Sequence, residues 1–448
     1  MLTLWFERAL LPAGWVDRVR ISVDGATISA VETDVAPGPD DQRHGAALPG
    51  LCNVHSHGFQ RGMAGLSERR GRPDDDFWSW REVMYRFLDR LTPDDIEAIT
   101  AQAYVEMLEG GFTRVGEFHY LHNDIDGARY ADPAETAGAI VAAADATGIG
   151  LTLLPVFYAH ADFGGAPPVP GQRRFISDVD GFARLVEASR AKLPADAMLG
   201  IAPHSLRAVT PEELAAIVPL ANGGPLHIHA AEQVREVEAC IAWSGARPVE
   251  WLLDNAAVDA RWCLIHSTHV NGGETARLAA SGAVAGLCPV TEANLGDGVF
   301  PAVDYLAAGG RFGIGTDSNI LIDAASELRG LEYSQRLMLR KRALLVDTAE
   351  PSVGATLFAK AQAGGAQALG VTSGLAPGRP ADIVSLDLQH PALIGAGGDL
   401  LDRWIFAARP GAIDGVWRAG RQVVAHGRHI AAGAIAERYR RTVAALLA

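Results

Sequence analysis

Cysteine is scarce in this chain of 448 residues. It occurs four times and never in a C-x-x-C arrangement. Scattered single cysteines argue against a disulfide framework and against a thiolate metal site, because both need cysteines that pair or cluster. We therefore expect small, buried, apolar side chains in a reducing compartment at Cys52, Cys240, Cys263 and Cys288.

Long uncharged hydrophobic runs are also missing. No stretch stays apolar over the roughly 20 residues that a membrane-spanning helix needs. The amino-terminal segment MLTLWFERALLPAGW has no basic lead and reaches Glu7 and Arg8 early, unlike a secretory signal peptide. We expect a protein that stays in the cytoplasm and has no membrane partner.

Positive charge is in deficit, with 39 lysines and arginines against 53 aspartates and glutamates, and the net charge is −14. Such a chain repels nucleic acids and anionic membranes, so neither is an expected partner. An anionic small molecule gains no long-range attraction either. Any specificity for carboxylates must therefore come from a few local arginines.

The residues that are present describe a large globular protein. Hydrophobic residues make up 48% and charged residues 21%, which argues against disorder. The length exceeds one ordinary core and predicts a large domain with a smaller one. Eight short apolar runs have the pattern of parallel strands buried on both faces. The predicted strands are residues 51–55, 113–120, 150–158, 198–204, 226–232, 263–267, 283–289 and 312–317.

Helical segments separate these predicted strands. Two of them, TPDDIEAITAQAYVEMLEGG and TPEELAAIVPLA, begin with Thr-Pro followed by acidic residues, which is typical of a helix amino terminus. Eight strand–helix units predict an α/β fold with a (β/α)8 TIM-like barrel over residues 49–374. A doubly wound open sheet is the alternative. It does not explain why polar residues follow nearly every predicted strand.

The two chain ends show another pattern. VRISVDGATISAVET contains two strand-like runs around Asp24-Gly25, and GVWRAGRQVVAHGRHI contains two around Gly420; both patterns predict hairpins. We infer that residues 1–48 and 375–448 combine into a small composite β-sandwich domain beside the barrel. Residues 164–174 follow the third predicted strand and are either a lid over the active face or a plain surface loop.

His55 and His57 close the first predicted strand, where side chains two residues apart point to the same side. The pair alone is weak evidence for a metal site, since histidines in strands more often form local hydrogen bonds. Other strands add the missing ligands, His229 from the fifth and Asp317 from the end of the eighth. Three imidazoles and a carboxylate suit one divalent metal ion, zinc in the first place and ferrous iron as the alternative.

Acid–base groups lie at the same strand ends. A divalent ion lowers the pKa of bound water to about 7, and a side chain must accept the released proton. Glu232, three residues after His229, can reach over the metal without binding it and can serve a leaving nitrogen. His266 is a candidate base or electrostatic aid, and Asp317 can bind metal through one oxygen and water through the other. The predicted catalytic residues are Glu232, His266 and Asp317.

This set resembles the amidohydrolase superfamily, and within it the deaminase branch that holds a single metal. The branches with two metals use a carboxylated lysine at the end of the fourth strand. That position here reads APHSLR, and the lysines of the chain are Lys192, Lys341 and Lys360. The resemblance therefore implies one metal ion.

A narrower resemblance is to the formimidoylglutamate deiminases of histidine degradation, and it covers essentially the whole chain. It rests on HSHGFQRGMAG, GEFHYLH, APHSLRAVTPEEL, HIHAAEQ, CPVTEANLGDGVFP and GTDSNILIDAASELRGLEYSQR. It implies hydrolysis of N-formimino-L-glutamate to N-formyl-L-glutamate and ammonia, and it suggests a homodimer. The substrate pocket of that family maps onto Gln60, Arg81, Tyr120, His204 and Arg207.

These assignments suit the chemistry of a dicarboxylate substrate. Arg81 and Arg207 can each hold one carboxylate through paired charge-assisted hydrogen bonds, and Glu232 suits the cationic formimino end. Without the resemblance, Arg81 would be placed on a solvated helix face. Gln60 could equally tie down the loop after the first strand.

Two alternatives stay open. An aminohydrolase of a ring amine, such as guanine or a thioadenosine, would share the metal ligands but would not need paired arginines. A barrel without catalysis that serves as a scaffold is disfavoured by the intact set of ligands and acid–base groups. We interpret His119 and His122 as residues that either pack in the core or support the site from behind it. Phe77, Trp78 and Trp80 are interpreted as core or interface rather than substrate contacts.

Overall fold

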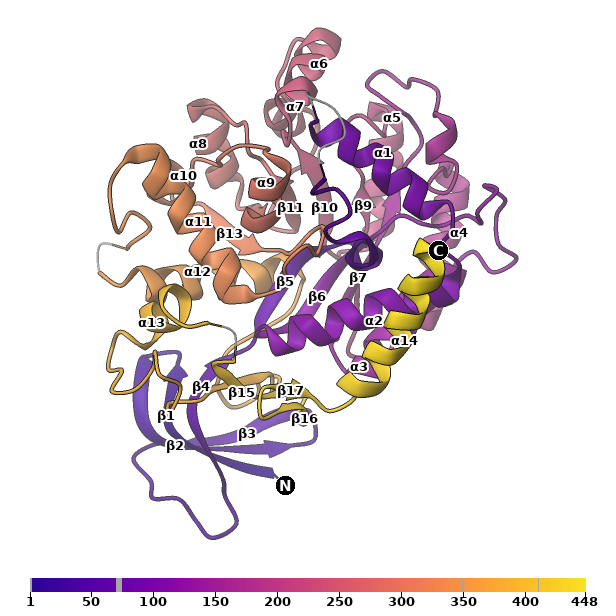
Figure 1. Ribbon diagram of the computed structural model, residues 1–448. Coiled ribbons are helices and arrows are strands. Elements are labelled where there is room, and N and C mark those ends of the chain that lie inside the picture. The colour runs from indigo at the N-terminus through magenta and orange to yellow at the C-terminus, as the bar shows by residue number, and fades with distance from the viewer. Residues whose placement is uncertain (1, 70–74, 348–349, 410) are drawn as a thin grey trace.

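The computed structural model describes residues 2–69, 75–347, 350–409 and 411–448 (Figure 1). Within these ranges, none of the helices has the length and apolar character needed to cross a membrane. The strands form two separate sheets, one from the middle of the chain and one from its two ends.

The barrel sheet contains the strands predicted in the middle of the chain. Its neighbours follow the order β10-β11-β12-β13-β5-β6-β7-β8, with β9 beside β7. All of these pairs are parallel. The strands are β5 (Leu51–Ser56), β6 (Phe112–His119), β7 (Gly150–Phe157), β8 (Met198–Leu199), β9 (Ala202–Pro203), β10 (Leu226–Ala230), β11 (Trp262–His266), β12 (Val284–Leu287) and β13 (Arg311–Ile314).

The ring closes between the fourth and fifth strand positions. The amides of His227 and His229 donate to the carbonyls of Ile201 and His204, at 3.1 and 3.0 Å. The predicted continuous strand over 198–204 is split into β8 and β9 around Gly200, where a Cβ atom would lie 2.4 Å from the Pro225 carbonyl oxygen. The closed ring confirms the (β/α)8 barrel and rules out the doubly wound sheet.

Helices surround the barrel sheet (Figure 1). The amino termini of α2 and α5 confirm the two predicted starts, because Thr92 and Thr210 accept from the amides of Asp95 and Glu213. The helices are α1 (Phe77–Leu88), α2 (Pro93–Glu109), α3 (Glu135–Thr147), α4 (Val179–Lys192), α5 (Pro211–Ile217), α6 (Val234–Ser244), α7 (Pro248–Asn255), α8 (Gly272–Ser281), α9 (Pro289–Leu295), α10 (Ala302–Ala307), α11 (Ala324–Leu339) and α12 (Val353–Ala368), with short 3-10 turns η1 (Gly58–Met63), η2 (Pro170–Gln172) and η3 (Val218–Ala221).

Both chain ends build the second sheet, in the order β17-β16-β15-β14-β4-β1-β2-β3. The predicted hairpins are confirmed, with Asp24 opposite Thr27 and Arg418 opposite Arg421. The sheet curls, so that Phe6 and Trp417 meet edge to face at 6.4 Å within a small separate core. Its strands are β1 (Leu2–Leu11), β2 (Gly14–Asp24), β3 (Thr27–Glu32), β4 (Gln42–Pro49), β14 (Ile383–Leu386), β15 (Ile413–Arg418), β16 (Arg421–Ala425) and β17 (Arg428–His429).

The carboxyl-terminal segment differs from the prediction that assigned all of residues 375–448 to the sandwich domain. It also contains α13 (Leu400–Phe406) and α14 (Ala432–Leu447), and α14 lies along α2 (Figure 1). Ile435, Tyr439 and Val443, each four residues apart, pack against the barrel core. An amphipathic helix needs an apolar surface to cover its one face, and α2 provides it.

Candidate active site

The predicted metal ligands converge at the carboxyl ends of three barrel strands. His55 lies in β5, His57 directly after it, His229 in β10 and Asp317 just beyond β13. The Nε2 atoms of His55 and His229 are 3.1 Å apart. Asp317 Oδ1 lies 3.3 Å from Nε2 of His55 and 3.2 Å from Nε2 of His57. All of these side chains are buried.

Hydrogen bonds fix which nitrogen of each ring faces the centre. Nδ1 of His57 is 2.9 Å from the Phe118 carbonyl, and Nδ1 of His229 is 2.9 Å from the His204 carbonyl. A carbonyl can only accept, so both rings carry their proton on Nδ1 and turn an Nε2 lone pair inward. Lone pairs that face one another and a carboxylate repel unless a cation lies among them. This donor set therefore fits one divalent metal ion.

The backbone around Asp317 is strained and firmly held. Asp317 and His266 both have a positive φ, of 44° and 66°, which is uncommon for residues other than glycine. A buried network supports this loop: Asn53 Nδ2 donates to Thr316 Oγ1 at 2.7 Å, and Asn319 Nδ2 donates to the His57 carbonyl at 3.0 Å. The network ties the Asp317 loop to the strand that carries His55 and His57.

The predicted acid–base residues lie beside the metal ligands. Nε2 of His266 is 3.7 Å from Glu232 Oε1 and 3.9 Å from Asp317 Oδ2. Burial raises the pKa of Glu232 to about 7. Burial also opposes the charge of His266, but Glu232, Glu292 and Asp317 outweigh it and raise the pKa of His266 to about 10.

Glu292 was not identified from the sequence. It comes from α9, and its Oε1 lies 3.3 Å from His266 Nδ1 and accepts from the Cys288 amide at 2.9 Å. Only its position four residues after Cys288, in a helix that follows the seventh strand, could have drawn attention to it.

One cavity opens onto these groups and is also lined by every residue predicted to bind substrate. Gln60 Nε2 donates to the Tyr120 hydroxyl at 3.0 Å, and both lie near Met84. The predicted residues in its wall are His57, Gln60, Arg81, Tyr120, His204, Arg207, His229, Glu232, His266 and Asp317. The structure thus brings the sequence-predicted set together, with His55 directly behind it.

Arg207 is the cationic residue held deepest in this wall. Its side chain is 7% exposed, it forms no ion pair or side-chain hydrogen bond with any described residue, and its Nε is buried without a partner. A buried guanidinium without an acceptor is costly unless a ligand supplies one. The cavity is therefore suited to an anionic group.

The aromatic wall of the cavity was only partly foreseen. Phe77 and Trp80, interpreted above as core or interface, line the cavity together with Tyr158 and Phe175. The Tyr158 hydroxyl accepts from Gln172 Nε2 at 2.8 Å, so the end of the irregular 164–174 segment is anchored in this wall. None of these aromatic side chains carries a motif that sequence analysis could use.

His119 and His122 are buried side chains that satisfy local hydrogen bonds. Nε2 of His119 lies 3.0 Å from Thr136 Oγ1, and Nε2 of His122 lies 2.9 Å from the Val156 carbonyl. Both rings are therefore part of the packing, as interpreted. The four cysteines are free and buried, as expected.

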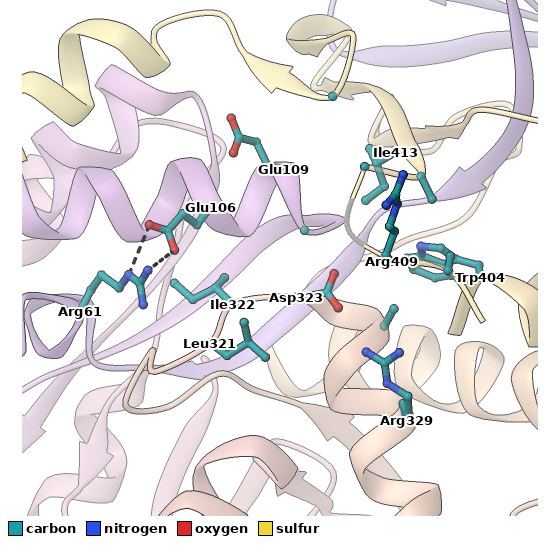
Figure 2. Close-up of a pocket in the computed structure, with 16 residues that line it drawn as sticks. Arg61, Glu106, Glu109, Leu321, Ile322, Asp323, Arg329, Trp404, Arg409 and Ile413 are labelled. Atoms are coloured by element: carbon teal, nitrogen blue, oxygen red, sulfur yellow. Dashed lines mark hydrogen bonds and ion pairs between the residues drawn. The ribbon is translucent and has the colours of Figure 1, made fainter. Parts of the chain in front are cut away.

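A second cavity lies where α2 and α11 meet the carboxyl-terminal segment (Figure 2). Several of its charged groups already have partners. Arg61 pairs with Glu106 at 2.9 Å, Glu109 accepts from the His429 amide, and Asp323 caps α11. None of the predicted site residues lines it. The chemistry belongs to the first cavity.

Comparison with known proteins identifies the family of this chain. Residues 46–423 match the amidohydrolase family, and residues 1–45 match the amino-terminal domain of formimidoylglutamate deiminase HutF. A formimidoylglutamate deiminase from Pseudomonas aeruginosa is 53% identical over 96% of both chains. A 5-methylthioadenosine/S-adenosylhomocysteine deaminase from Natronomonas pharaonis is 30% identical over 81% of this chain and 77% of its own.

Solved structures show the same fold. An amidohydrolase from Brucella melitensis superposes with a TM-score of 0.97 at 53% identity, over all of both chains. An adenosine deaminase from Xanthomonas campestris with bound zinc superposes with a TM-score of 0.82 at 24% identity, over 100% of this chain and 98% of its own. The chain therefore belongs to the amidohydrolase family, and within that family to the formimidoylglutamate deiminases.

Proposed function

We propose that this protein hydrolyses N-formimino-L-glutamate to N-formyl-L-glutamate and ammonia. One observation carries the proposal beyond the family relationship. The guanidinium of Arg207, which is buried and whose Nε has no hydrogen-bond partner, lies in the same cavity wall as Glu232 and His266. A ring amine would leave that cation unpaired, whereas a carboxylate of formiminoglutamate supplies its acceptor.

The substrate would lie with its formimino carbon at the metal end and its carboxylates at the arginine end. Arg207 and Arg81 each bind one carboxylate. Tyr120 and His204 add hydrogen bonds along the chain of the substrate, and Gln60 orients the Tyr120 hydroxyl at 3.0 Å. This orientation places the reacting carbon between Glu232 and Asp317.

One metal ion, zinc by preference, would be held by His55, His57, His229 and Asp317. Such a cation supplies a nucleophile at neutral pH by lowering the pKa of a bound water to about 7. Glu232 accepts a proton from the attacking water and passes it to the departing nitrogen. His266, held as an imidazolium by Glu292, donates from Nε2 toward the oxygen on which negative charge develops.

The bonds balance in this scheme. The water oxygen forms a bond to the formimino carbon, and the bond from that carbon to its terminal nitrogen breaks. The departing nitrogen gains both protons of the water: Glu232 carries the first, and Asp317 carries the second, which the hydroxyl releases as its carbon–oxygen double bond forms. The new carbon–oxygen double bond completes the formyl group. No oxidant or further reactant is needed.

Two further assignments concern location and assembly. A cytoplasmic location suits the free, buried cysteines and an enzyme of histidine degradation. A homodimer is suggested by the family alone. Sedimentation velocity measures the mass in solution and decides between one and two copies.

A substrate panel tests the proposed function. Metal-replete protein is given formiminoglutamate, formiminoaspartate or guanine, and ammonia release is followed. We expect turnover of formiminoglutamate to be the fastest. Brisk release from guanine with none from formiminoglutamate would favour a ring-amine aminohydrolase and overturn the proposal.

A further inference from the structure

Three arginines from different parts of the fold surround the indole of Trp78. The guanidinium carbons of Arg81, Arg235 and Arg207 lie 4.4, 4.6 and 5.5 Å from its ring centroid. We call these four residues the arginine–tryptophan cluster. Any two of the guanidinium carbons are therefore at most about 10 Å apart, which is close for like charges.

The four residues come from three segments at the active face of the barrel. Trp78 and Arg81 lie in α1, Arg207 follows the fourth strand, and Arg235 lies in the first turn of α6. Figure 1 shows α1 and α6 at the same end of the barrel. The cluster joins α1 to two segments that follow it by more than a hundred residues, and it lies beside the cavity that Arg81 and Arg207 line.

Arg235 has no structural partner that explains its place. It is exposed, and it forms no ion pair and no side-chain hydrogen bond with the described residues. Its guanidinium lies over the ring of Trp78, whose face attracts a cation through the ring quadrupole. The indole holds Arg235 near two other cations, although electrostatic repulsion alone would move its guanidinium away from them.

We propose that Arg235 is a specificity-determining residue. Together with Arg81 it binds the substrate carboxylate that lies nearer the protein surface, which we call the outer carboxylate. The inference rests on the proposed function, since it assumes a dicarboxylate in the cavity. Arg207, buried at 7% exposure, then holds the inner carboxylate. Trp78 is a positioning residue that keeps the two outer guanidinium groups within reach of one anion.

Arg81 and Arg207 line the cavity, and Trp78 holds Arg235 beside them. A substrate with two carboxylates brings two negative charges to the cluster and removes most of the repulsion among the arginines. A ring amine or a monocarboxylate would leave at least two of the three guanidinium charges without a carboxylate partner. The cluster therefore selects for dicarboxylates, which the metal centre cannot do.

The test compares Arg235→Gln with Arg184→Gln, which changes an exposed arginine on α4 outside the cavity. We expect Arg235→Gln to raise KM for formiminoglutamate about tenfold with kcat nearly unchanged, because a partly exposed charged contact is lost. Arg184→Gln should behave as the wild type. An unchanged KM in Arg235→Gln, or a loss confined to kcat, would overturn the assignment.

Two substrate analogues show whether the effect belongs to one carboxylate. Formimino-4-aminobutyrate lacks the α-carboxylate, and formimino-2-aminobutyrate lacks the side-chain carboxylate. The tenfold rise in KM caused by Arg235→Gln should disappear for the analogue that lacks the outer carboxylate. It should persist for the analogue that keeps this carboxylate. An effect of equal size on both would mean that Arg235 acts only through the general field, and the inference would fail.

A binding measurement separates this inference from the proposed function. If the wild type does not turn over formiminoglutamate, the proposed function fails. Calorimetry with glutarate then tests Arg235 on its own. Weaker glutarate binding in Arg235→Gln than in Arg184→Gln would support dicarboxylate recognition, and equal binding would reject it.

Discussion

Replacing Arg207 with methionine separates a ligand-binding role from a structural one. Methionine fills the space of the arginine stem and removes the charge. In the structure the guanidinium is buried, its Nε has no partner, and no described residue forms an ion pair with it. Folding therefore gains little from this charge, whereas a bound carboxylate depends on it.

Arg207→Met should lower the activity without lowering the stability of the fold. Loss of one partner of a buried charged pair costs about 2–5 kcal/mol, so kcat/KM for formiminoglutamate should fall about 30- to 5,000-fold. The free energy of unfolding should change little, because Arg207 forms no ion pair with a described residue and its charge is favoured only through nearby groups such as Glu236 and Glu232. A structural role for Arg207 would predict a loss of both.

The assay combines ammonia release at several substrate concentrations with thermal unfolding followed by circular dichroism. Bound metal is measured in each sample, so that a lost ion is not mistaken for lost substrate binding. The reasoning would be refuted by a kcat/KM within about threefold of the wild type. It would also be refuted by a clear fall in the unfolding temperature that accounts for the lost activity.

Four further perturbations probe the metal centre and its acid–base groups. Burial raises the pKa of Glu232 to about 7, and a protonated carboxyl cannot accept a proton. The value of kcat/KM should therefore fall as the pH drops below about 7. A bound cation favours the charged carboxylate and would move the midpoint of this fall to a lower pH. Asp317→Asn should lose most of its bound metal in elemental analysis while the fold persists. Removing metal from the wild type with a chelator should lower the unfolding temperature by about 5 °C or more, because the lone pairs of His55 and His229 then oppose each other at 3.1 Å. Glu292→Gln should lower kcat about 10- to 100-fold with metal retained, since His266 loses its charged partner.

Each of these perturbations has a control or a contrary outcome. A Glu232→Gln variant with substantial activity and an unchanged acidic limb would remove Glu232 from the mechanism. Asp145→Asn, an exposed site on α3, should retain its metal, and full metal in Asp317→Asn would contradict the ligand set. Zinc added back after chelation should restore the unfolding temperature. For Glu292→Gln, an unchanged kcat would show that Glu292 does not position His266.

The sequence by itself determined the barrel and the hairpins, and it grouped the candidate metal ligands. Apolar runs indicate which segments are buried on both faces of a sheet, and polar residues follow nearly every one of these runs. Parallel strands bring their carboxyl ends to one face of a barrel, so His55, His229 and Asp317 could be grouped before any contact was known. Chain order and periodicity were sufficient for this step.

Only the tertiary structure decided which loop residues meet. Periodicity marks the buried face of a helix but not the neighbour that covers it, so the packing of α14 on α2 was not foreseen. Glu292 beneath His266 and Arg235 beside Trp78 depend on the path of loops from different strands. Their contacts are set by packing across long sequence separations, for which a single sequence carries no local signal.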